Sequence, residues 1–164
     1  MLQSEALGEG HLVDQFESGA QSLDDWLKFS ARTSDAKRQS RTYVWHQGDG
    51  VVVAYFALAP HVIERAVLPR SQEAGNLDQI PSLLLARLAL DLSLQGSGLG
   101  SELLIDALSR SVSASNDVGG RFVVVDAIDQ AAAEFYEHHG FRPCNTGDMR
   151  RLIRKVSDIA VSLG

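Results

Sequence analysis

Apolar residues follow a helical period in some stretches of the chain and form continuous β-rich runs in others. Near the N-terminus, the helical period predicts a helix over residues 23–35. Ser22 and Asp25 have the spacing of a capping box, so we expect Ser22 to begin this helix. The β-rich runs over residues 41–46 and 51–59 flank a Gly/Asp turn, and this pattern predicts a β-hairpin.

Strands and helices alternate in the second half of the chain. The near-continuous apolar run over residues 83–92 predicts a buried strand, and a helical period then runs from Leu99 until Gly119 and Gly120 end the helix. Three more elements follow in the pattern: a strand over residues 121–127, a short helix over residues 130–139 that Asp129 caps, and a last strand over residues 151–156. This order predicts an α/β domain with a mixed sheet.

The composition of the 164-residue chain suits one globular domain, because 45% of the residues are hydrophobic and 22% are charged. The single cysteine, Cys144, excludes an intrachain disulfide and suits a reducing compartment. His11, His46 and His61 are dispersed along the chain, and no motif has metal-site spacing, so we expect no metal. The N-terminus lacks a signal-peptide pattern, and no apolar run reaches the roughly 20 residues of a membrane span. We therefore expect a cytoplasmic protein with no membrane contact.

The net charge of −6 argues against a protein that coats itself with nucleic acid through bulk charge. The charge is unevenly distributed, however, because basic residues gather in two segments. The first is a candidate RNA-binding stripe made of Lys28, Arg32, Lys37, Arg38 and Arg41, and the second contains Arg142, Arg150, Arg151, Arg154 and Lys155. Two alternatives stay open for these residues, namely a solvated surface or a surface that meets acidic residues of a protein partner.

A glycine-rich segment between the expected strand and helix carries the sharpest chemical signal. It reads Gln95, Gly96, Ser97, Gly98, Leu99, Gly100. Alternate glycines allow a tight turn that exposes main-chain N–H groups, and the following helix directs its first N–H groups to the same place. The segment is therefore a candidate site for a phosphate or pyrophosphate, although a strand–helix turn without a ligand is the open alternative. A P-loop is excluded because Ser101 stands where that motif has lysine, and the dinucleotide fingerprint is excluded because Ser101 replaces its third glycine.

The glycine segment and a later motif together resemble the GNAT superfamily of acetyl-CoA-dependent N-acetyltransferases. The later motif reads Ala132-Ala-Glu-Phe-Tyr-Glu-His-His-Gly-Phe141, and the resemblance covers about residues 88–141. Nearly the whole chain also resembles the GNAT-type toxins of bacterial toxin–antitoxin modules. The stretches that carry this second resemblance are residues 16–19, 22–27, 41–44, 54–59, 80–81 and 85–89.

The resemblance implies a single GNAT-like domain over residues 1–164, with a mixed, mostly antiparallel sheet flanked by helices. It also implies a toxin that uses acetyl-CoA to acetylate the α-amino group of aminoacyl-tRNA and so blocks translation. A ribbon-helix-helix antitoxin and a homodimer are the implied protein partners. The implied cosubstrate contacts are the strand at Leu88, Ala89 and Leu90 for the pantetheine arm and the main-chain N–H groups of Gln95 to Gly100 for the pyrophosphate.

Tyr136 is the implied general acid, because the tyrosine of this Phe-Tyr pair has that role in the family. A phenol with a pKa of about 10 stays protonated at neutral pH and can deliver a proton to a leaving thiolate. The alternative is that Tyr136 only packs beside Phe135.

No protein base is evident, and an aminoacyl ester needs little help because a free α-amine has a pKa of only about 7.7–8.0. The four side chains that could serve as a base are Asp129, Glu134, His138 and His139, but surface solvation is the explanation that the sequence favours for each of them. Two other functions stay open: a GNAT enzyme for a small amine or a protein N-terminus, and a GNAT fold that binds acetyl-CoA or a partner without turnover.

Overall fold

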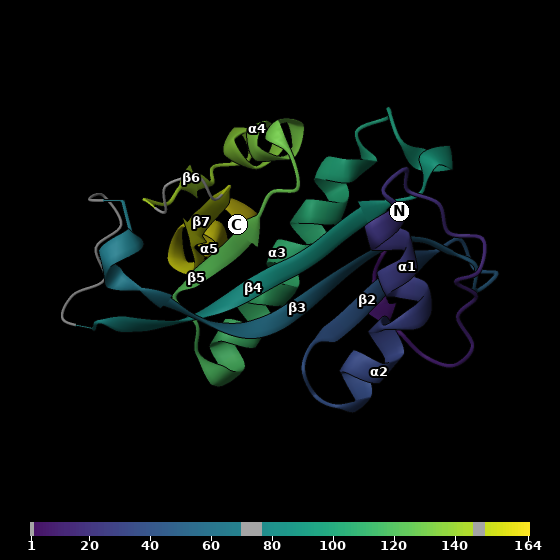
Figure 1. Cartoon of the computed structure of the whole chain (residues 1–164), viewed down its shortest axis with the longest axis horizontal. Helices are drawn as coiled ribbons and strands as arrows, with labels where there is room; N and C mark the ends of the chain where they lie inside the picture. The colour runs from purple at the N-terminus through teal and green to yellow at the C-terminus, as the bar shows by residue number, and fades with distance from the viewer. Residues whose placement is uncertain (1, 70–76, 146–149) are drawn as a thin grey trace. The chain divides into compact units, whose positions relative to one another are not determined.

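The computed structural model describes residues 2–69, 77–145 and 150–164 (Figure 1). These residues form two compact units. The first unit comprises Met1–Ala59 with Leu85–Ala107, and the second comprises Pro60–Leu84 with Leu108–Gly164. Among the described residues, no helix has the length and apolar character that a bilayer crossing requires.

In the part of the chain that the structure describes, seven strands are hydrogen-bonded in the order β1-β2-β3-β4-β5-β7-β6. Their bounds are β1 Glu5–Ala6, β2 Arg41–His46, β3 Val52–Glu64, β4 Gln79–Leu90, β5 Phe122–Asp126, β6 Arg142–Pro143 and β7 Arg151–Lys155. The helices are α1 Gln21–Phe29, α2 Ala31–Ala36, α3 Leu99–Val118, α4 Gln130–His138 and α5 Val156–Leu163. The pairs β1–β2, β2–β3, β5–β7 and β6–β7 are antiparallel, which confirms the expected mostly antiparallel sheet flanked by helices.

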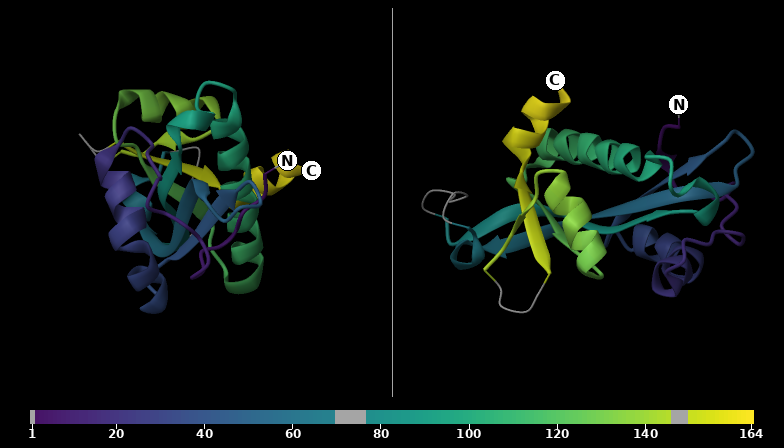
Figure 2. Two further views of the ribbon diagram at one scale, coloured as in Figure 1. Left: turned by 90° about the vertical axis from the view of Figure 1, so that its right-hand side faces the viewer. Right: turned by 90° about the horizontal axis from the view of Figure 1, so that it is seen from above.

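In the first unit, helices cover both faces of the strands. The right-hand view of Figure 2 shows α1 and α2 on one side of β2 and β3 and the beginning of α3 on the other. A buried core lies under α1 and α2 and contains Val13, Phe16, Leu23, Leu27, Ala31, Val44, Val52, Tyr55 and Ala89. On the α3 side, the Asp106 carboxylate accepts the Trp45 indole N–H at 2.7 Å and the Ser4 hydroxyl at 2.7 Å. Trp45 is almost fully buried.

In the second unit, β5, β6 and β7 form the antiparallel part of the sheet, and α4 and α5 contact β7. Its core is a separate cluster made of Ile63, Leu68, Ile80, Phe122, Val124, Cys144 and Ile153. Cys144 is a buried free thiol, and burial raises its pKa to about 11, which keeps it protonated at neutral pH.

The helix expected over residues 23–35 is in fact two helices. Ser30 interrupts it, because its backbone leaves the helical region with φ −127° and ψ −30°, and it serves as the C-cap of α1 and the N-cap of α2. Leu27 and Ala31 on either side of the break are both buried. The apolar period therefore continues through a one-residue break that periodicity cannot reveal.

The prediction of a capping box at Ser22 and Asp25 is wrong. Helix α1 begins at Gln21 with Ala20 as its N-cap, and no side chain caps it. Asp24 on α1 instead holds the segment before the helix. The Ser18 main-chain N–H and hydroxyl donate to its carboxylate at 3.0 Å and 2.6 Å.

The strands also differ in extent from the expected ones. The hairpin is confirmed, with Tyr43 opposite Phe56, but β3 continues to Glu64. Strand β4 ends at Leu90 rather than at residue 92, because a short 3-10 helix, η3 (Leu92–Leu94), follows. The short strand β1 and the C-terminal helix α5 were not expected from the sequence, and α5 begins at Val156, the last residue of the expected strand.

Candidate functional site

The glycine loop, residues 95–100, joins β4 to α3 in the first unit. Asp91 caps η3 just before it: one carboxylate oxygen accepts the Ser93 N–H at 3.0 Å and hydroxyl at 2.6 Å, and the other accepts the Glu17 N–H at 2.9 Å. Burial disfavours the ionised carboxylate, but the hydrogen bonds from Ser93 and Glu17 outweigh it and lower the pKa of Asp91. An ionised Asp91 therefore fastens the start of the loop to the segment that precedes α1.

The side chain of Gln95 fastens the loop a second time. Its Nε2 donates to the main-chain oxygens of Ser18 at 2.8 Å and Leu90 at 2.7 Å. The Gln95 main-chain N–H donates to the Leu92 oxygen at 3.2 Å. The sequence led us to expect this N–H to face a ligand, but the structure uses it within the turn. Gln95 therefore positions the loop.

The rest of the loop presents an open surface of main-chain groups. Gly96 and Gly98 have φ values of +85° and +82°, in the left-handed region that favours glycine. A Cβ added at Gly96, Gly98 or Gly100 would meet no atom within 4 Å. The 20-residue helix α3 begins at Leu99, and its first N–H groups have no partner within the helix. This arrangement is suited to a phosphate or diphosphate group.

The end of β4 precedes the loop in the same unit. Ala89 is buried in the core, whereas Leu88 and Leu90 are half-buried. These small and aliphatic side chains leave main-chain groups as the polar features of this stretch, and the Leu90 oxygen already accepts the Gln95 side chain. The stretch can therefore offer a ligand an extended backbone and apolar contacts.

Tyr136 lies on α4 in the second unit, with its side chain only 9% exposed. Its ring is held edge-on by Phe135 and Phe141, with centroid separations of 5.4 Å and 5.5 Å. Burial raises the pKa of the phenol to about 12. The hydroxyl makes no hydrogen bond with any residue that the structure describes, and it is not fully enclosed. Tyr136 therefore offers a protonated, accessible donor on a rigid ring.

None of the candidate bases on or beside α4 has contacts with the described residues that indicate a role as a base. Asp129 caps α4, as the sequence predicts, by accepting the Ala132 N–H at 2.8 Å. Glu134 and His138 are exposed. Burial lowers the pKa of His139, and electrostatic interactions with His138 and then Arg154 lower it further. The structure thus gives Asp129 a structural role, which the sequence could not separate from a contact with a ligand.

A second polar cluster in the same unit was not expected. Arg151 on β7 lies opposite Asp126 on β5 and binds its carboxylate through two hydrogen bonds of 2.7 Å and 2.8 Å. Its Nη1 also donates to Nε2 of His61 at 3.1 Å, so the proton of this imidazole is on Nδ1. Burial, followed by the Arg151 charge, lowers the pKa of His61. Arg151 is therefore committed to this cluster and is not a free cation of the second basic segment.

The five residues of the expected RNA-binding stripe all lie in the first unit, but they are not equivalent. The Arg32 guanidinium donates to the main-chain oxygens of Gly8 at 3.1 Å and His11 at 2.7 Å, so it holds the N-terminal segment. Exposed side chains occur at Lys37, Arg38 and Arg41, and Lys28 is half-buried.

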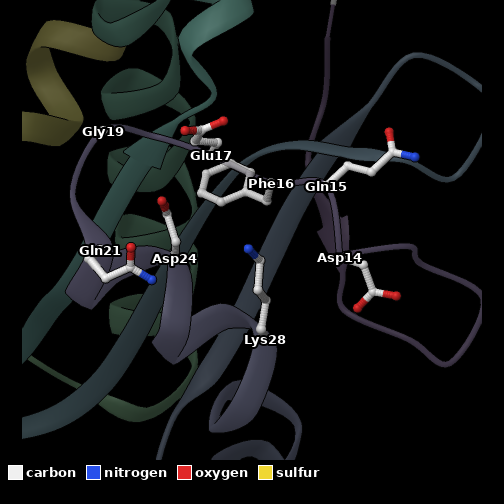
Figure 3. Close-up of a pocket in the computed structure, with 8 residues that line it drawn as sticks. All are labelled: Asp14, Gln15, Phe16, Glu17, Gly19, Gln21, Asp24 and Lys28. Carbon is white, nitrogen blue, oxygen red and sulfur yellow. The ribbon is translucent and has the colours of Figure 1, made fainter.

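Lys28 also lines a polar pocket of about 440 Å³ beside α1 (Figure 3). The other lining residues are Asp14, Gln15, Phe16, Glu17, Gly19, Gln21 and Asp24. In Figure 3 the Lys28 side chain rises from α1 toward the Phe16 ring. Glu17 connects this pocket to the base of the glycine loop, because its main-chain N–H donates to Asp91 and its oxygen accepts the Leu92 N–H at 2.8 Å.

Two of the histidines that are dispersed in the sequence come together in the first unit. Glu5 Oε1 accepts hydrogen bonds from Nε2 of His11, at 2.7 Å, and from Nε2 of His46. The three ligand-type atoms lie within 4.8 Å of one another, which is close enough for one metal ion. Residues that are dispersed in the sequence thus meet in the fold, which the spacing of the histidines did not indicate.

The hydrogen bonds behind the rings nevertheless do not fit a metal site. Nδ1 of His11 accepts the Gly8 N–H at 2.8 Å, and Nδ1 of His46 accepts the Gly48 N–H at 3.0 Å. An imidazole that binds a metal through Nε2 carries its proton on Nδ1 and donates it to an acceptor. Here that proton would face a main-chain N–H in both rings. The cluster is therefore a hydrogen-bonded clasp around Glu5, whose pKa it lowers.

Comparison with known proteins identifies the family. Residues 38–143 match the model of an acetyltransferase (GNAT) domain. A tRNA-acetylating toxin of Mycobacterium tuberculosis (strain ATCC 25618 / H37Rv) is 38% identical over 152 residues, which cover 93% of this chain and 90% of the toxin.

Solved structures agree with this match. AtaT complexed with acetyl-methionyl-tRNAfMet superposes with a TM-score of 0.90 at 28% identity, over 100% of both chains. A mutant AtaT toxin bound to the C-terminus of the antitoxin AtaR and acetyl-CoA has a TM-score of 0.84 at 27% identity, over 99% of this chain and 98% of that one. The open glycine loop, the buried tyrosine and these matches show that the chain belongs to the GNAT family of acetyltransferases.

Proposed function

We propose that this protein is a toxin that transfers the acetyl group of acetyl-CoA to the α-amino group of an aminoacyl-tRNA and thereby blocks translation. The observation that carries the proposal is the glycine loop, whose open main-chain N–H groups stand at the start of α3. The identity of the acceptor rests on similarity, because a relative with 38% identity is a tRNA-acetylating toxin. The reaction would take place in the cytoplasm, where aminoacyl-tRNA is consumed.

The loop and the end of β4 would bind acetyl-CoA. Main-chain N–H groups from Gly96 to Gly100 would hold the pyrophosphate, while Gln95 and Asp91 keep the loop in shape. The pantetheine arm would extend along Leu88, Ala89 and Leu90 and pair with main-chain groups. A main-chain N–H of this strand would polarise the thioester carbonyl and stabilise the oxyanion that forms on attack.

Tyr136 would act as the general acid of the transfer. The amine nitrogen bonds to the acetyl carbon, the C–S bond breaks, and the phenol gives its proton to the departing thiolate. The proton that the amine loses returns through water to the phenolate. A pKa of about 12 keeps the phenol protonated over the whole physiological pH range, so the general acid always carries the proton that it donates.

The acceptor amine needs no strong protein base. A free α-amine has a pKa of about 7.7–8.0, and the neighbouring ester lowers it further, so a substantial fraction is already neutral at pH 7. This chemistry suits an aminoacyl ester better than a lysine side chain, whose amine has a pKa of about 10.4. Asp129, the candidate base nearest the start of α4, is meanwhile occupied as a cap.

Partners follow from the same proposal. Exposed Lys37, Arg38 and Arg41, with Lys28, would contact tRNA phosphates, while Arg32 holds the N-terminal segment. Because a similar toxin structure contains the C-terminus of the antitoxin AtaR, we infer regulation by an antitoxin, of the ribbon-helix-helix class. We also infer a homodimer.

Acetyl transfer from labelled acetyl-CoA tests the proposal. Charged tRNA should become labelled, whereas the same tRNA after deacylation should not. Tyr136→Phe should lower turnover about 10²–10⁴-fold without weakening acetyl-CoA binding. Tyr43→Phe, which removes a phenol hydroxyl from β2, is the matched control and should keep full activity. Equal labelling of charged and deacylated tRNA would refute the α-amine acceptor, and labelling of small amines or peptide N-termini alone would favour the other kind of GNAT enzyme.

A further inference from the structure

Arg87 is a cation for which the described part of the chain provides no acceptor. It lies on β4 in the first unit, and its side chain is half-buried. Its Nε is fully enclosed and makes no hydrogen bond, and its terminal nitrogens make no hydrogen bond or ion pair with any described residue. A guanidinium is always charged and carries five N–H donors. A group of this kind is expected to be paired when it is withdrawn from water.

The nearby carboxylate is already occupied. Both Asp24 and Arg87 act electrostatically on Tyr55, which places the two charges in one region of the unit. The Asp24 carboxylate, however, accepts the Ser18 N–H and hydroxyl, and Asp24 is only 5% exposed. The Asp24 carboxylate thus holds the segment before α1, and the N–H donors of Arg87 remain available to an anionic ligand.

An anchored aromatic ring holds the guanidinium in place. Its central carbon lies 4.7 Å from the centroid of the Trp26 ring. Trp26 is in turn stacked on Tyr55, with centroids 6.0 Å apart and planes inclined by 12°. The Tyr55 hydroxyl donates to the Leu23 main-chain oxygen at 2.7 Å, and this hydrogen bond fixes the Tyr55 ring on which Trp26 stacks. A guanidinium stacked on a fixed ring is ready to bind a planar or tetrahedral oxyanion through two N–H groups.

The sequence position of Arg87 indicates which anion this is. It immediately precedes Leu88, the first residue proposed to contact the pantetheine arm of acetyl-CoA. In an aminoacyl-tRNA, the phosphodiester between the last two nucleotides is the anion nearest to the aminoacyl ester. We propose that Arg87, stacked on Trp26, binds this phosphodiester and so recognises the 3′ end of the tRNA. The inference rests on the proposed function and names one contact of its substrate.

Two small substrates isolate this contact. An aminoacyl-adenosine lacks the phosphate, whereas the aminoacyl-adenosine 5′-phosphate carries it at the position of the last phosphodiester. Hydrogen bonds to charged groups are worth enough to change an equilibrium about 10–100-fold. The unmodified protein should therefore have a kcat/KM about 10–100-fold higher for the phosphorylated substrate.

Variants assign the preference to Arg87. Arg87→Met should reduce the ratio of the two kcat/KM values to about one, and Arg87→Lys, which keeps the charge but loses the planar fork, should retain part of it. Arg142→Met removes one exposed arginine from β6 and should leave the ratio unchanged. Circular dichroism shows whether each variant is folded, and the ratio in the unmodified protein tests the idea even if Arg87→Met unfolds.

Each outcome supports or overturns the inference. A ratio near one in the unmodified protein, or an equal loss for both substrates in Arg87→Met, would overturn it. A weaker Kd for acetyl-CoA in Arg87→Met with an unchanged ratio would also overturn it, since the anion would then be a phosphate of CoA. If charged tRNA is acetylated but the ratio is one, only this contact is wrong. If neither charged tRNA nor either small substrate is acetylated, the proposed function itself fails.

Discussion

Replacing Gly98 by alanine separates the binding role of the glycine loop from its contribution to stability. Gly98 has φ +82°, and a Cβ there would meet no atom within 4 Å. The cost to the free protein is therefore conformational and not steric. A non-glycine residue in the left-handed region costs about 1–2 kcal/mol. For a chain of this size, 1 kcal/mol lowers the Tm by roughly 2–4 °C, so we expect a decrease of about 2–8 °C.

The effect on acetyl-CoA should be larger than this strain explains. The new methyl group would occupy the open space in which the pyrophosphate approaches the loop, and it would displace at least one main-chain N–H from the phosphate. Losing one hydrogen bond to a charged group costs about 1.5–3 kcal/mol. We therefore expect the Kd for acetyl-CoA, measured by titration calorimetry, to rise at least about tenfold.

Gly48→Ala is the matched control. Gly48 lies in the turn between β2 and β3, has φ +98°, and would also place its Cβ in open space. This variant should show a similar decrease in Tm, because it carries the same backbone strain, but an unchanged Kd. If both variants lose the same stability and both bind acetyl-CoA normally, the loop is not the pyrophosphate site.

Three further predictions concern charge and hydrogen bonding. A general acid works while protonated, and burial raises the pKa of Tyr136 to about 12, so kcat should stay level from pH 8 to pH 10; a decline centred near pH 10 would contradict the buried acid. Hydrogen bonds from His11 and then His46 lower the pKa of Glu5 below 4.5, so its contribution to stability is present above that pH and is lost as the pH falls through the lowered value. Glu5→Gln should therefore flatten the pH dependence of urea unfolding below pH 5, and an unchanged profile would count against the clasp. Asp106→Ala leaves the Trp45 indole N–H and the Ser4 hydroxyl without their acceptor and should lower the free energy of unfolding by about 2–3 kcal/mol; a loss below about 0.5 kcal/mol would show that water replaces the carboxylate.

The sequence predicted those features that depend on neighbouring residues. The glycine loop, the helix capped by Asp129 and the hairpin around residues 47–50 all arise from local backbone preferences, and the structure contains each of them. The assignments of cosubstrate and acid to particular residues came from a family resemblance, and they stay predictions until the variants are measured.

Features that join distant segments were not predictable. Glu5, His11 and His46 meet only because β1 pairs with β2, and Arg151 meets Asp126 only because β7 pairs with β5 in one register. The break at Ser30 was hidden because the buried residues on either side keep the helical period. In each case, pairing register or a single backbone dihedral decides the outcome, and the pattern of apolar residues records neither.

The position of the acetyl group on the tRNA shows whether the protein acetylates the α-amino group of an aminoacyl-tRNA. Charged tRNA is incubated with acetyl-CoA and the protein, digested with ribonuclease, and its terminal nucleoside is examined by mass spectrometry. We expect an N-acetyl-aminoacyl-adenosine to form with the unmodified protein, and we expect its rate of formation to fall about 10²–10⁴-fold with Tyr136→Phe. An unmodified aminoacyl-adenosine, or an acetyl group on the nucleotide rather than on the α-amine, would contradict it.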